Sequence, residues 1–217
     1  LLLCIEENHS PRLSYTEAGR GVKKESPSFT ENTDGEATAK GAFFMTMLSL
    51  RKELTGSILD VGGGGEGIIG RLYGSSVTII DHCQEELDEA PCSCPKLLMD
   101  AASLAFADAS FENVTFFYSL MYMNRPVQSA ALAEAVRVLK PGGRLLLWDC
   151  EIACAYPEPF LAELDVRWAR ERVCTTYGVV KSDPQSMEDF LTLCRGNGLT
   201  LLKTETASGH FYLEFRK

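Results

Sequence analysis

Residues 58–72, ILDVGGGGEGIIGRL, decide the fold of this chain. The apolar start, which ends on Asp60, predicts a buried strand, and the apolar residues after the four glycines 62–65 predict a helix. Glycine has no Cβ, so the backbone can turn sharply there and let a ligand approach closely. The helix then presents unpaired N–H groups and its positive dipole end. Such a unit holds the polar part of a nucleotide-like cofactor; a glycine-rich turn without a ligand is the alternative.

The acid before the glycines separates two classes of cofactor. Gly62, Gly64 and Gly67 satisfy the G-x-G-x-x-G pattern of dinucleotide sites, and Asp81 follows about twenty residues after the pattern begins. In a dinucleotide fold the diphosphate lies against this turn, where the carboxylate of Asp60 would repel it. S-adenosylmethionine has no phosphate and carries an ammonium and a sulfonium group, which an acid at this place favours.

Further apolar strands alternate with helices along the chain. The predicted strands are 57–60, 76–81, 96–100, 114–118 and 144–149, and the predicted helices between them are 66–73, 84–89 and 130–139. This alternation of solidly apolar strands with helices predicts an α/β fold with a parallel sheet covered on both faces. Near the end, Ser186 caps a predicted helix that runs to about residue 195. Ser208-Gly209 then joins 199–206 and 211–216 into a predicted hairpin.

The remaining segments are less regular, and residues 1–217 are predicted to form a single domain. Residues 1–33 are polar and predict an N-terminal arm, with a lid over the active site as the alternative. Helical spacing of apolar residues predicts a helix over 36–54. Residues 152–185 predict an insertion that shapes the substrate site, with a helix over 160–172 and a β-like segment over 173–180.

Composition excludes several classes of protein. The net charge of −9 over 217 residues disfavours nucleic acid as a partner. No apolar run is long enough for a membrane span, and we expect no signal peptide. The eight scattered cysteines indicate reduced thiols in a cytoplasmic protein. A soft-metal site is the alternative for four of these cysteines, which are Cys92, Cys94, Cys150 and Cys154. Their spacing fits no standard zinc site, so we predict no metal.

The order of these signals resembles one enzyme family. The acid and glycine loop, the acids after the next two strands, and the segment EAVRVLKPGGRLLLWD at 134–149 resemble class I S-adenosylmethionine-dependent methyltransferases. The last segment is most similar to small-molecule methyltransferases of the ubiquinone/menaquinone biosynthesis type. The resemblance implies a Rossmann-like, doubly wound sheet of seven strands in the order 3-2-1-4-5-7-6, with the last strand antiparallel. One departure is Glu66, which stands at the family's third glycine position.

The resemblance also implies the residues that bind S-adenosylmethionine. Asp60 would orient the ammonium group of the cofactor. Gly62, Gly63 and Gly64 would let the methionine part lie on the loop. Asp81 would accept hydrogen bonds from both ribose hydroxyls.

Residues later in the chain would contact the adenine and form the floor of the site. The resemblance implies that His82 flanks the adenine, and that Asp100 accepts from its amino group beside the N–H of Ala101. Tyr118 and Ser119 would close the floor near the methionine. The alternatives are a plain surface position for His82, and a helix cap or solvated loop for an acid at a strand end.

Methyl transfer from a sulfonium is an in-line displacement with a neutral leaving group, so positioning of the acceptor supplies most of the acceleration. A general base is needed only for a weak nucleophile that carries a proton. Tyr122, Asp149 and Glu151 are the catalytic candidates, with packing for Tyr122 and a loop cap for Asp149 as alternatives. The apolar side chains near them, such as Met121 and Trp168, line the acceptor site or belong to the core.

We therefore predict S-adenosylmethionine-dependent methyl transfer to a small molecule. A non-catalytic module that binds S-adenosylmethionine is the first alternative, and an NAD(P)-dependent oxidoreductase is the second. The acceptor and the oligomeric state are not indicated by the sequence.

Overall fold

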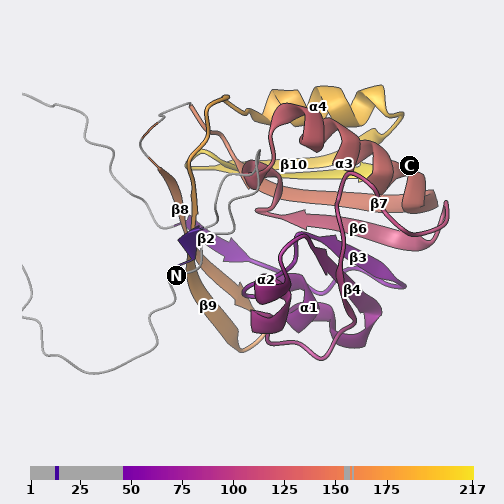
Figure 1. Cartoon of the computed structure of the whole chain (residues 1–217), viewed down its shortest axis with the longest axis horizontal. Coiled ribbons are helices and arrows are strands. Elements are labelled where there is room, and N and C mark those ends of the chain that lie inside the picture. The colour runs from indigo at the N-terminus through magenta and orange to yellow at the C-terminus, as the bar shows by residue number, and fades with distance from the viewer. Residues whose placement is uncertain (1–12, 15–45, 154–156, 158) are drawn as a thin grey trace, which may run out of the picture.

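The computed structural model of the chain describes residues 13–14, 46–153, 157 and 159–217. Its main sheet has seven strands in the order β10-β11-β7-β6-β3-β4-β5 (Figure 1). The bounds of these strands are β3 Ile58–Val61, β4 Val77–Asp81, β5 Lys96–Leu98, β6 Phe111–Phe117, β7 Leu139–Cys150, β10 Thr200–Ala207 and β11 His210–Arg216. Strands β3 to β7 are parallel to one another, whereas β11 is antiparallel to both β7 and β10. The predicted order and the antiparallel last strand are confirmed.

The helices divide between the two faces of this sheet. They are α1 Ile68–Tyr73, α2 Gln84–Glu89, α3 Arg125–Val138 and α4 Met187–Gly196, with two short 3-10 turns, η1 Gly74–Ser76 and η2 Leu120–Tyr122. Residues of α1 and α2 belong to one apolar cluster and residues of α3 and α4 to another, so the main sheet is covered on both faces, as predicted. No helix among the described residues has the length and hydrophobicity that a membrane crossing needs.

Helix boundaries differ from the predictions where local chemistry decides them. Helix α1 begins two residues later than predicted, because Gly67 takes a left-handed φ of 55° and becomes its N-cap. Helix α3 begins five residues earlier, because the side chain of Asn124 accepts from the N–H of Val127 and caps that end. At α4, Ser186 and Asp189 form a capping box, and this helix start is confirmed.

A second, smaller sheet is built from the insertion and from the segment before β3. Strands β8 Phe160–Trp168 and β9 Glu171–Val179 form an antiparallel ribbon, flanked by β1 Leu13–Ser14 and β2 Thr46–Ser49 in the order β1-β9-β8-β2. The prediction of a helix over 160–172 is therefore wrong, and that of a strand over 173–180 is confirmed. Figure 1 shows this sheet at the end of the main sheet toward which the arrow of β6 points.

The segment before β3 also differs from its prediction. Residues 46–49 are strand β2, parallel to β8, and residues 50–57 connect it to β3, so the described part of the predicted helix 36–54 is not helical. The strand forms because β8 offers it a pairing edge, and β8 was itself missed. Residues 36–45 lie outside the described residues, as does all of the predicted arm 1–33 except Leu13–Ser14, which pairs with β9.

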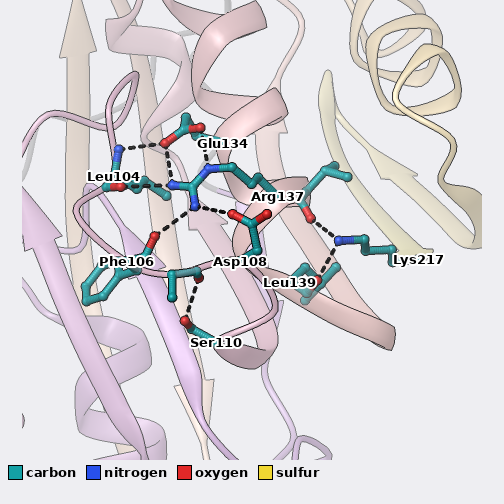
Figure 2. A network of polar contacts seen from close by, with 10 residues as sticks. Leu104, Phe106, Asp108, Ser110, Glu134, Arg137, Leu139 and Lys217 are labelled. Carbon is teal, nitrogen blue, oxygen red and sulfur yellow. Dashed lines mark hydrogen bonds and ion pairs between the residues drawn. The ribbon is translucent and has the colours of Figure 1, made fainter.

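An arginine in α3 fixes the loop between β5 and β6 (Figure 2). The guanidinium of Arg137 donates to both carboxylate oxygens of Glu134 at 2.7 Å and to Asp108 Oδ1 at 2.8 Å. It also donates to the carbonyls of Phe106 at 2.8 Å and Leu104 at 2.9 Å, and the N–H of Leu104 donates back to Glu134 at 2.8 Å. This network holds the loop against α3 by charge-assisted bonds.

The prediction of reduced thiols is wrong for one pair of cysteines. Cys92 and Cys94 form a disulfide, whereas Cys83, Cys150, Cys174 and Cys194 are free. The loop between α2 and β5 folds over Gly70, and a Cβ at Gly70 would lie 2.8 Å from both sulfurs. Within the described part of the chain no group of side chains is arranged to hold a metal ion. Cys154, the fourth cysteine of the metal alternative, lies outside that part.

Candidate active site

The glycine loop follows β3 and is packed between β4 and α2. The N–H groups of Gly62 and Gly63 donate to the carbonyl of Ile80 at 2.8 and 3.2 Å, and Gly62 has a φ of 70°. A Cβ on Gly63 would lie 2.2 Å from Asp60 Oδ2, and one on Gly64 would lie 2.6 Å from Glu86 Cβ. Gly63 and Gly64 therefore leave no room for a side chain, because Asp60 and Glu86 lie too close. Gly62 is favoured by its left-handed backbone conformation.

Two buried carboxylates flank this loop at the ends of adjacent parallel strands. Asp60, at the end of β3, is 1% exposed, and its Oδ1 accepts from Thr115 Oγ1 at 2.7 Å. Asp81, which ends β4, is 3% exposed, and its Oδ2 accepts from the N–H of Gly64 at 3.2 Å. Both acids thus lie where the sequence analysis expected them, and Asp81 also fixes the loop.

Asp81 also bonds to the backbone that follows β4. Asp81 Oδ1 accepts from the N–H of Cys83 at 3.1 Å, at the start of α2. The ring of His82 is 61% exposed, with its Nδ1 3.3 Å from Asp81 Oδ1. The ribose role of Asp81 and the adenine role of His82 stay predictions.

Asp100 and Ala101 follow β5 at the same edge of the sheet. Asp100 is exposed, and its Oδ1 accepts from the N–H of Ala102 at 2.8 Å, which is a local turn bond. Ala101 is half-buried. Their contacts to the adenine also stay predictions.

Tyr118 and Ser119 lie where β6 ends. Tyr118 has a φ of 51°, a left-handed conformation that is costly for a bulky residue and recurs at ligand sites. Its hydroxyl shares a 2.9 Å hydrogen bond with Nδ1 of His210, the first residue of β11. Ser119 Oγ donates to the carbonyl of Val61 at 2.7 Å and joins this turn to β3.

The Tyr118–His210 pair is a feature that the sequence analysis missed. Burial raises the pKa of the Tyr118 hydroxyl and lowers the pKa of the His210 ring, so both groups are neutral at pH 7. His210 pairs with Cys150 across β11 and β7, which brings it to the carboxyl edge of the sheet. The hairpin around Ser208-Gly209 was the only signal in the sequence that could have placed it.

Asp149 is a buried structural acid. Its oxygens accept from the N–H groups of Met121 at 3.1 Å and Cys150 at 2.8 Å and from Gln185 Nε2 at 2.7 Å. Burial raises its pKa to about 6. These contacts correspond to the loop-cap alternative: they hold the turn η2 and the end of the insertion against β7.

The other candidates near Asp149 also have structural partners. Glu151 accepts from the N–H of Met187 at 3.0 Å, at the first turn of α4. Tyr122 is half-buried and packs against the apolar cluster that also contains Met121 and Trp168. These contacts agree with the packing alternative, and catalytic roles for Tyr122, Asp149 and Glu151 stay predictions.

The fold and the site together define a class of protein. Its sheet order, its glycine loop and its terminal acids are those of a Rossmann-like methyltransferase fold. A solved methyltransferase from Methanosarcina mazei, described as SAM-dependent, aligns with 78% of this chain and 99% of its own at a TM-score of 0.56 and 20% identity. The N-methyltransferase NodS from Bradyrhizobium japonicum, solved with S-adenosyl-L-homocysteine, aligns with 75% of this chain and 78% of its own at a TM-score of 0.52 and 15% identity.

Sequence similarity over part of the chain points to the same class of protein. Residues 59–147 match the family model described as "Methyltransferase domain". A ubiquinone/menaquinone biosynthesis C-methyltransferase from Paracoccus denitrificans is 32% identical over 144 residues, which are 60% of this chain and 56% of that relative. The chain thus spans little more than half the length of this curated relative. Over residues 59–147 the chain therefore resembles a class I methyltransferase domain, the class whose methyl donor is S-adenosylmethionine.

Proposed function

We propose that this chain transfers a methyl group from S-adenosylmethionine to a small-molecule acceptor. The observation that carries the proposal is the pair of buried carboxylates, Asp60 and Asp81, on either side of a loop that only glycine fits. Asp60 places a carboxylate where a diphosphate would lie, which disfavours a dinucleotide and favours a cationic adenosine compound, whereas an acid at Asp81 suits the ribose of either cofactor. The nicotinamide alternative is correspondingly weakened.

The residues present fit this cofactor. Asp60 lies beneath Gly63, where it would attract the ammonium group. Asp81 would exchange its bond from the Gly64 N–H for bonds from the ribose hydroxyls. Asp100 and His82 would bind the adenine, with Ala101 beside it, and Tyr118 and Ser119 would close the floor. When bound, the cofactor supplies an electrophilic methyl group on a sulfonium; the chain supplies orientation.

Charge and relatives support a small acceptor. The net charge of −9 repels polyanions such as nucleic acids. The relative from Paracoccus denitrificans acts, by its name, in quinone biosynthesis as a C-methyltransferase. Where β6 ends, the ring of Tyr118 stacks on that of Tyr177 from β9, with centroids 5.5 Å apart. An apolar, ring-containing acceptor suits such surroundings.

Calorimetry with S-adenosylhomocysteine tests the cofactor site. We expect the wild-type chain to bind it, and Asp81→Asn to bind about tenfold more weakly or worse, because a charged acceptor is worth on the order of 1–3 kcal/mol. Asp88→Asn, on exposed α2, is the matched control and should leave the affinity unchanged. Melting temperatures measured without ligand separate lost folding from lost binding.

Two results would redirect the proposal. Binding of NADH in place of S-adenosylhomocysteine would contradict it and restore the oxidoreductase alternative. Binding of S-adenosylhomocysteine without methyl turnover on a broad metabolite panel would favour the non-catalytic module. Turnover on any member of the panel identifies the acceptor class directly.

A further inference from the structure

The ribbon of β8 and β9 presents one face to the glycine loop and to α1. Cross-strand register places five pairs of side chains on this face. The pairs are Trp168 with Glu171, Val166 with Val173, Leu164 with Thr175, Ala162 with Tyr177, and Phe160 with Val179. All but Phe160, Glu171 and Val173 are buried, and the apolar members pack into the same cluster as α1. The ribbon therefore rests on the elements that form the cofactor site.

Two contacts join β9 to the parts of the site nearest the methionine of the cofactor. Thr175 Oγ1 donates a short hydrogen bond to Glu66 Oε1 in the glycine loop. Two residues further on, the ring of Tyr177 stacks on that of Tyr118, with 5.5 Å between centroids and 20° between planes. Since alternate residues of a strand share a face, both contacts depend on the same placement of β9.

A third contact joins the ribbon to α1. The guanidinium of Arg71 lies 5.1 Å above the ring of Trp168 and donates to Glu171 at 3.3 Å. These residues stand at the turn between β8 and β9, so the ribbon is attached along its length. The side chain of Glu171 is 59% exposed, so this ion pair contributes little to holding the ribbon.

Glu66 links this ribbon to the backbone that must receive the cofactor. It stands between Gly65 and Gly67, whose φ values are 64° and 55°. On the opposite side of the loop, the N–H of Gly65 donates to the carbonyl of Glu86 at 2.8 Å. The loop is thus held between α2 and the ribbon, and a shift of its backbone changes the distance from Glu66 to Thr175.

We propose that Glu66 and Thr175 are positioning residues that couple cofactor binding to closure of the β8–β9 ribbon. The cofactor fixes the loop, the loop fixes Glu66, and Glu66 holds β9 so that Tyr177 lies on Tyr118 at the acceptor side. The glutamate at the third glycine position, a departure from the family pattern, has this role. The inference rests on the proposed function, because it needs a cofactor on the loop.

Hydrogen–deuterium exchange of the ribbon tests the coupling, with S-adenosylhomocysteine as the probe. At a free ligand concentration of about 100 times Kd, openings that release the ligand become about 100-fold rarer, so we expect ribbon exchange to slow by tenfold or more. In Thr175→Val a methyl group replaces the hydroxyl, so the shape is kept and the donor is lost, and the protection by ligand should fall below about twofold. Thr175→Ser keeps the hydroxyl and should restore it.

Thr176→Val is the matched control, because Thr176 lies on the opposite face of β9 and should keep the wild-type protection. If Thr175→Val fails to fold by circular dichroism, Glu66→Ala breaks the same bond from the half-buried loop side. Equal ribbon protection in wild type and variant, with ligand bound to both, would overturn the coupling alone. Absence of calorimetric binding to the wild type would remove the proposed function and the coupling with it.

Discussion

Asp149 is a carboxylate kept in the core by the backbone that it organises. It is fully buried, and its three hydrogen-bond donors come from β7, from η2 and from the segment before α4. Burial penalises the charged form more than these donors compensate it, so its pKa rises to about 6. The residue therefore makes folding stability depend on pH in a range where most carboxylates have finished titrating.

The sign of that dependence can be tested. The folded pKa of about 6 lies above the unfolded value near 4, so this contribution to stability is complete below pH 4 and is lost as the pH rises through 6. The loss amounts to about 3 kcal/mol. Asp149→Asn does not titrate, so from pH 4 to pH 7 its free energy of unfolding in urea should gain about 2 kcal/mol relative to wild type. A difference between Asp149→Asn and wild type that stays constant with pH would contradict this prediction.

At the residue scale, the positions of the site residues in the fold could be predicted better than their hydrogen-bond partners. Asp60 and Asp81 follow from apolar strands that end on an acid, because parallel strands bring their carboxyl ends to one edge. The bond from the Gly64 N–H to Asp81 does not follow, since it depends on how the loop folds back. His210 meets Tyr118 across 92 positions in sequence, through the register of an antiparallel strand that sequence alone does not fix.

At the element scale, the strand–helix units of the central sheet could be predicted and the insertion could not. Residues 160–168, FLAELDVRW, contain residues that favour helices, yet Ala162, Leu164, Val166 and Trp168 are buried at period two. Pairing with β9 and β2 decides between the two patterns. The wrong prediction of a helix over 160–172 also removed strand β8, which is the parallel partner of β2. Without that partner, residues 46–49 were predicted as part of a helix.

The loop between β5 and β6 depends on one side chain of α3. Arg137 donates three hydrogen bonds to this loop, two of them to backbone carbonyls, and two more to Glu134 in its own helix (Figure 2). Arg137→Lys keeps the charge and loses the planar fork, so we expect a loss of about 1–3 kcal/mol in the free energy of unfolding. The midpoint of guanidinium unfolding measures it. Arg195→Lys, exposed in α4, should change stability by no more than about 0.5 kcal/mol; an equal effect of both would refute the clamp.

At the scale of the whole molecule, the two sheets share one core. The cluster on the α1 face contains Ile58 and Leu146 of the main sheet together with Leu164 and Val166 of the ribbon, each at most 4% exposed. The main sheet and the ribbon cannot separate without exposing this shared apolar surface to water, which is unfavourable. The two sheets are therefore expected to unfold together. This supports our proposal that residues 1–217 form a single domain, in which the insertion is a structural part and also shapes the substrate site.

The two tryptophans test this cooperativity, because one lies in each sheet. Trp148 is in β7 and Trp168 in β8. Trp168→Phe leaves a fluorescent reporter of the main sheet, and Trp148→Phe leaves a reporter of the ribbon. Each variant is heated and followed by tryptophan fluorescence and by far-ultraviolet circular dichroism. We expect the two melting midpoints to coincide, since one core unfolds as a unit.

The same experiment can be repeated with ligand. S-adenosylhomocysteine at about 100 times Kd should raise the fluorescence and dichroism midpoints by the same amount, which corresponds to about 2.7 kcal/mol of stabilisation. A Trp168 transition well below the dichroism midpoint would show that the ribbon unfolds separately and would divide the chain into two units.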